Sequence, residues 1–109
     1  MLYILEVNVE IPNGIKKDGQ YLTWLKDEIG HDEWFVMAKE ILDIRKNKIE
    51  FFSRSFKGNI CTNEYVAQSI ENIDILKSAI EKHMSSDKFI ITYVEKEFDG
   101  SIRDYVFLQ

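Results

Sequence analysis

Residues 3–11, YILEVNVEI, decide the fold because apolar and polar side chains largely alternate along them. One side of such a strand carries five apolar residues: Tyr3, Leu5, Val7, Val9 and Ile11. A period of two is typical of a β-strand with one face against a core. Pro-Asn-Gly at 12–14 then supplies the backbone angles of a turn. We therefore expect a half-buried strand over 3–11.

The next segment, 20–29, predicts a short helix. Four apolar side chains recur there at helical spacing: Tyr21, Leu22, Leu25 and Ile29. Gly30 follows at a position where helices commonly end.

Residues 33–57 fit two interpretations. A helix would align five apolar side chains: Trp34, Met37, Ala38, Ile41 and Ile44. A hairpin turning at Lys46-Asn47 would instead place the aromatic pair that follows the turn in a strand. We favour strands over 35–45 and 48–56, and a helix over 31–40 remains the alternative.

The last 50 residues predict a long helix and a hairpin. Beginning at Thr62, apolar side chains follow a spacing of three or four: Val66, Ile70, Ile73, Leu76, Ile80 and Met84. This stripe is typical of an amphipathic helix, which the polar residues 85–87 would end. Asp99-Gly100 then lies between two apolar runs, and that pattern favours a hairpin over 89–109 with a three-residue loop.

These elements give the order β-α-β-β-α-β-β. At 109 residues, with 45% hydrophobic and 30% charged residues, the chain fits one globular domain over 1–109. The predicted class is α+β, with an antiparallel-rich sheet and two helices packed mainly on one face.

The charge and the cysteine content limit the partners and the compartments that we expect for the chain. The net charge of −5 argues against coating of DNA or RNA, which needs a broad basic face. The single cysteine, Cys61, excludes a disulfide within the chain. The N-terminus lacks the pattern of a signal peptide, and no apolar run approaches the length of a membrane span. We expect a cytoplasmic protein without a membrane contact.

A basic stretch, residues 45–58, stands out against this acidic background. Its net charge is +4, so the remaining residues carry a net charge of −9, which together give the total of −5. Its first bases would protect the exposed edges of a hairpin turn. Its end leads into the predicted helix, where a helix N-terminus attracts anions. We therefore predict an anion-binding or ligand-binding set: Arg54, Lys57, Gly58, Asn59, Thr62 and Tyr65. The alternative is a solvated strand end.

Two further groups offer weaker patterns. Acidic residues and His31 cluster within 27–33, but their spacing matches no metal or catalytic motif, which favours a polar connection between elements. Cys61 lies between apolar Ile60 and Thr62 without a neighbouring base, which favours a small buried residue over a nucleophile. We expect no catalytic residue, no metal and no cofactor, and we do not favour an enzyme.

The leading functional hypothesis is a small inhibitor-type protein, in the manner of immunity proteins, antitoxins or phage anti-defence proteins. Its acidic surface would steer a protein partner that is basic or binds nucleic acid, and aromatic side chains would anchor it. The two-sided apolar pattern of the last hairpin also allows a second copy of the chain as partner. The alternative function is a nucleotide-binding or phosphate-binding protein, or sponge, that uses residues 54–62.

Overall fold

The alternating stretch forms the centre of the molecule. In the computed structural model, which describes residues 1–46 and 49–108, it becomes β1 (Leu2–Glu10). β1 pairs antiparallel with β3 (Ile60–Ala67) on one side and with β4 (Ile91–Phe98) on the other. β2 (Ile49–Lys57) pairs antiparallel with β3, so the sheet order is β2-β3-β1-β4.

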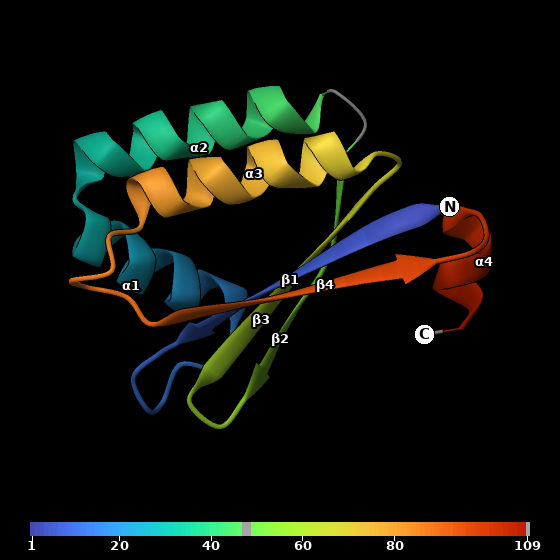
Figure 1. The fold of residues 1–109 in the computed structure, drawn as a ribbon. Helices are drawn as coiled ribbons and strands as arrows, with labels where there is room; N and C mark the ends of the chain where they lie inside the picture. The colour runs from blue at the N-terminus through green and yellow to red at the C-terminus, as the bar shows by residue number, and fades with distance from the viewer. Residues whose placement is uncertain (47–48, 109) are drawn as a thin grey trace.

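Most of the helical residues lie on one side of this sheet (Figure 1). They form α1 (Asp18–Ile29), α2 (His31–Arg45) and α3 (Ile70–His83). α2 and α3 run side by side in opposite directions (Figure 1). The chain order is β1-α1-α2-β2-β3-α3-β4-α4, which makes two interleaved split β-α-β units. The predicted class, a single α+β domain with an antiparallel sheet, is confirmed.

The main core lies between the sheet and α1–α3, on what we call the helix face. β1 supplies Leu5, Val7 and Val9 to it, as the alternation predicts, and α3 supplies Ile73 and Leu76. All five side chains are almost fully buried. The opposite, open face of the sheet is polar over most of β1, where Glu6 and Asn8 lie.

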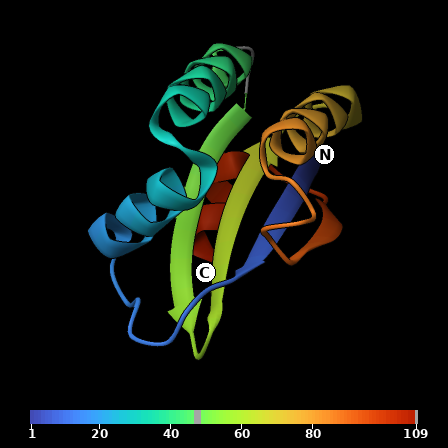
Figure 2. The same ribbon diagram turned by 90° about the vertical axis from the view of Figure 1, so that its left-hand side faces the viewer.

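The short helix α4 (Ile102–Phe107) covers one end of the open face (Figure 2). Tyr105 enters a second apolar cluster there, and its ring lies 5.2 Å from those of Phe52 and Phe98. The prediction of a strand after Gly100 is therefore wrong. Ser101 and Asp104 form a capping box, a helix-start signal that the apolar pattern of the last residues obscured.

The prediction of a strand over 35–45 is also wrong, and the helical alternative holds through Arg45. The helical interpretation is correct because Met37 is buried between α2 and the neighbouring elements. Residues on the outer side of α2, such as Phe35 and Val36, remain exposed. The expected hairpin turn at Lys46-Asn47 includes Asn47, which lies outside the described residues, as does Lys48, the first residue of the strand expected over 48–56. The strand expected over 48–56 agrees with β2.

The helix expected to begin at Thr62 begins later, at Ile70, with the hydroxyl of Ser69 as its N-terminal cap. Residues 60–67 instead alternate about the sheet, with Cys61 and Asn63 facing the helices. The order therefore differs from the expected β-α-β-β-α-β-β, and three helices rather than two cover the helix face. None of the helices within 1–46 and 49–108 has the length and apolar character needed to span a bilayer.

Candidate functional site

A pocket of about 400 Å³ lies between the helix face of the sheet and α1, α2 and α3. We call it the helix-side pocket. Its walls are mostly aliphatic and aromatic, and the polar side chains of described residues that line it include Tyr21, Arg45, Arg54, Asn63 and Tyr65. Protein interiors contain few voids larger than a water molecule, whereas ligand pockets measure roughly 300–1,000 Å³. The helix-side pocket therefore has the size of a small-ligand site.

An irregularity in β2 directs Arg54 into this pocket. The register between β2 and β3 shifts between Phe51 and Ser53, so Phe52 is an extra residue, and it packs on the open face. Side chains three positions apart in a regular strand point to opposite faces. Because of the bulge, Phe51 and Arg54 both line the helix-side pocket. Bulges commonly redirect side chains in this way beside functional sites.

Hydrogen bonds and aromatic rings fix the position of the Arg54 guanidinium. Its Nε donates to Oδ1 of Asn63 at 2.7 Å, and Nδ2 of Asn63 donates to the Val7 carbonyl at 3.3 Å. The guanidinium carbon lies 4.9 Å from the ring centroid of Phe51 and 5.0 Å from that of Tyr21. Such cation–π contacts hold a guanidinium without neutralising it.

Arg54 has one acidic neighbour, and that neighbour is largely in solvent. Oδ1 of Asp18 lies 3.8 Å from a terminal nitrogen of Arg54. The Asp18 side chain is 64% exposed, whereas that of Arg54 is 15% exposed. Solvent screening makes ion pairs of this kind weak. Most of the positive charge of Arg54 therefore remains available inside the pocket.

Arg45, the last residue of α2, supplies a second cation. Its Nε is buried and has no hydrogen-bond partner among the residues that the structure describes. Its guanidinium carbon lies 5.8 Å from the ring centroid of Phe51, so Arg45 and Arg54 converge on one ring. Within the described ranges no carboxylate forms an ion pair with Arg45. A buried N–H without a partner is unfavourable, and a ligand acceptor would satisfy it.

Tyr65 places a hydroxyl group beside these charges. It pairs with Phe51 across the two strands, with 5.4 Å between the rings, and only 8% of the residue is exposed. Burial raises the pKa of Tyr65, although the positive charges of Arg54 and Arg45 oppose that rise. The phenol therefore stays protonated at neutral pH. Its O–H makes no hydrogen bond within the described part of the chain and can donate to a ligand.

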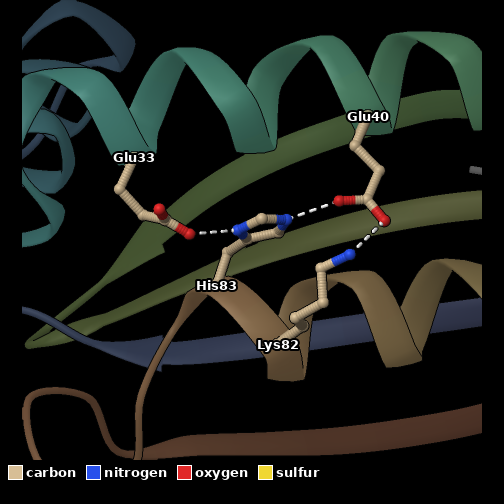
Figure 3. Close-up of polar contacts among 4 residues, drawn as sticks. All are labelled: Glu33, Glu40, Lys82 and His83. Carbon is tan, nitrogen blue, oxygen red and sulfur yellow. Dashed lines mark hydrogen bonds and ion pairs between the residues drawn. The ribbon is translucent and has the colours of Figure 1, made fainter.

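The buried side chain of His83 links α2 and α3, which form two walls of the pocket (Figure 3). Nδ1 of His83, at the end of α3, lies 2.5 Å from Oε1 of Glu33 on α2. Its Nε2 lies 2.5 Å from Oε2 of Glu40, whose other oxygen accepts from Lys82 at 2.9 Å. An ionised carboxylate only accepts hydrogen bonds, so both ring nitrogens donate and the ring is an imidazolium.

The pKa values agree with this assignment. Burial of the His83 ring opposes protonation, but the hydrogen bonds to Glu40 and Glu33 outweigh it and raise the pKa. The hydrogen bond from His83, assisted by Lys82, lowers the pKa of Glu40. We call Glu33, Glu40, Lys82 and His83 the α2–α3 clamp. It holds α2 over the pocket.

The structure separates the predicted binding residues. Arg54 and Tyr65 line the helix-side pocket. Lys57, Gly58 and Asn59 lie at the turn between β2 and β3, where Gly58 has the positive φ of 60° that the turn requires. The expected helix start at this point is wrong, because the chain continues into β3.

Thr62 lies on the open face, where its hydroxyl donates to Oδ1 of Asn8 at 2.6 Å. Sequence reasoning missed three pocket residues. Arg45 is the last residue of the strand expected over 35–45, Asn63 faces the pocket only through the alternation of β3, and the spacing of Tyr21 predicts only a place on the core side of a helix. A strand pattern over 60–67 is the signal that would have found Asn63 and Tyr65 together.

The structure also places the two weaker groups. Residues 27–33 span the joint between α1 and α2 at Gly30, as the polar-connection interpretation predicts, and His31 and Asp27 are both 67% exposed. Within the described residues no set of three metal-binding side chains comes together. Cys61 is fully buried, and burial raises its pKa to about 11, so its thiol stays protonated at neutral pH.

Comparison with known proteins adds no relative. No family model, curated protein or solved structure matches this chain. The candidate site therefore rests on the geometry described above.

Proposed function

We propose that this protein binds a small organic anion in the helix-side pocket. The observation that supports the proposal best is the convergence of Arg45 and Arg54 on the Phe51 ring, beside the hydroxyl of Tyr65. Two guanidinium groups and a phenol donor are the groups that recognise carboxylates and phosphates.

The charge distribution supports the same conclusion. The chain has a net charge of −5, yet the polar end of the helix-side pocket carries two cations, and no carboxylate of the described residues lines it. Removing a charge from water is unfavourable unless a partner compensates it. A bound anion would compensate both cations, and binding would then stabilise the fold.

Calorimetric titration with decanoate and AMP tests the proposal. We expect at least one of these anions to bind, and Arg54→Gln to weaken that binding at least tenfold, because a charge-assisted hydrogen bond contributes about 1.5–3 kcal/mol. Lys57→Gln is the matched control, since it removes one positive charge outside the pocket. Equal affinity in wild type and Arg54→Gln, or loss in Lys57→Gln alone, would contradict the proposal.

Binding of a macromolecular partner is the second candidate function. Exposed apolar side chains on α4 favour it, since Phe107 is 78% exposed and Val106 is 52% exposed. Adjacent exposed apolar residues are typical of contact surfaces. If a second copy is the partner, sedimentation equilibrium should give a dimer that Phe107→Ser converts to a monomer. A wild-type monomer at all concentrations would exclude self-association through α4.

A further inference from the structure

We infer that the ligand of the helix-side pocket is an amphiphile: an aliphatic chain that ends in a single carboxylate. This inference rests on the proposed function and specifies its ligand. The pocket combines one polar end with a long apolar wall, and these two parts lie at different places along α2.

The polar end lies where α2 ends. Arg45 and Arg54 approach the same ring of Phe51, and Tyr65 packs on that ring from the neighbouring strand. A carboxylate beside this ring would have the two guanidinium groups and the phenol as its nearest candidate donors. Its single charge matches a site where Arg54 already has a weak partner in Asp18.

The apolar part extends from this end along α2 towards α3. Met37 lies eight residues before Arg45 on the same helix, which is about 12 Å along the axis. Together with Ile41 it lines the pocket, as do Ile80 of α3 and Met84, which directly follows α3. Methionine side chains adapt to chains of variable shape. An aliphatic tail would therefore find an apolar wall on each side.

A nucleotide fits this pocket less well. A base and a ribose need hydrogen-bond partners beyond the arginines, and among residues 1–46 and 49–108 Asn63 is the only amide side chain that lines the pocket. Its oxygen accepts from Arg54 and its nitrogen donates to the Val7 carbonyl, so its amide group is already used. The remaining walls are mostly aliphatic and aromatic, so they suit an aliphatic tail and offer a base edge few partners.

A series of carboxylates of increasing chain length tests whether the pocket binds an aliphatic tail. We expect the affinity to rise about fourfold with each methylene from hexanoate through octanoate to decanoate, because each buried methylene contributes about 0.8 kcal/mol. All concentrations are kept below the critical micelle concentration. Ala38→Leu adds volume to the pocket wall and should weaken decanoate more than hexanoate. An affinity that does not change with chain length would overturn the inference.

The head group is tested with decanol and decyltrimethylammonium, which share the decanoate tail. We expect both to bind at least tenfold more weakly than decanoate. Arg54→Gln and Tyr65→Phe should weaken decanoate and leave decanol unchanged, because only the carboxylate uses these donors. Equal binding of all three compounds would show a nonspecific apolar contact and would also overturn the inference.

AMP separates failure of this inference from failure of the proposed function. If AMP binds in an Arg54-dependent manner and the carboxylates do not bind, the pocket is an anion site and the inferred ligand class is wrong. If neither AMP nor any carboxylate binds wild-type protein, both are wrong. Binding of decanoate that requires Arg54 and grows with chain length supports both.

Discussion

His83→Gln should lower stability in a pH-dependent way, because His83 is the centre of the α2–α3 clamp. The substitution removes two charge-assisted hydrogen bonds of 2.5 Å from a side chain that is 3% exposed. Such bonds contribute about 1.5–3 kcal/mol when buried, and partial exposure of the carboxylates reduces this. We expect His83→Gln to lose about 2 kcal/mol near pH 6.

The sign of the pH dependence follows from the pKa shift. The pKa of His83 is raised above its ordinary 6.5, so its contribution is complete below that pH and is lost as pH rises through the folded-state pKa. The pKa of Glu40 is lowered from 4.5. Its contribution is complete above that value and is lost as pH falls through the folded-state pKa. The difference between wild type and His83→Gln should therefore be largest between these values and shrink towards pH 9.

Urea denaturation at pH 6 and pH 9 measures this difference. With m of about 1–2 kcal/mol/M, a loss of 2 kcal/mol lowers the midpoint by about 1–2 M. His31→Gln is the matched control, because His31 is 67% exposed and should change the free energy of unfolding by less than about 0.5 kcal/mol. Equal losses in the two variants, or a His83→Gln difference that stays constant with pH, would refute the assignment.

Three further predictions concern other parts of the molecule. Arg45→Met should keep or raise the free energy of unfolding of the ligand-free protein, by up to about 1 kcal/mol, because it removes a cation that forms no ion pair with a described residue; a loss of stability in a urea titration would contradict this. Tyr105→Phe should lose about 1–3 kcal/mol by the same titration, since the buried Glu64 would lose the hydroxyl that donates to it at 2.5 Å. Cys61 should react with iodoacetamide at pH 8 only after urea unfolds the protein, because it is fully buried and its pKa is about 11; rapid reaction of the folded protein would refute its placement.

Alternation and spacing predicted the elements whose local pattern had one interpretation. β1 follows the alternation of residues 3–11, α1 follows the spacing within 20–29, and β2 follows the strand expected over 48–56. The errors fell where two patterns overlapped. Val66 belongs to the alternation of β3, and it also continues the apolar stripe of α3 in the N-terminal direction. The apolar spacing alone therefore predicted one helix where the structure has β3 followed by α3.

The candidate site depended on features that lie outside local patterns. The extra residue Phe52 decides that Arg54 faces the helices, and regular alternation from Phe51 would have placed Arg54 on the open face. Arg45 reaches the same ring only because α2 continues to Arg45, the first residue of the basic stretch, and contacts β2. The sequence placed both arginines in one charged segment, but their convergence is a tertiary property.

The side-chain Nε–Hε NMR signals of arginine test the pocket most directly. The chain has three arginines, of which Arg45 and Arg54 line the helix-side pocket and Arg103 lies on α4. On titration with decanoate or AMP, the signals of Arg45 and Arg54 should shift together and saturate, while that of Arg103 stays in place. Unchanged signals from Arg45 and Arg54 at saturating anion, or a shift confined to Arg103, would contradict the assignment of the pocket as an anion site.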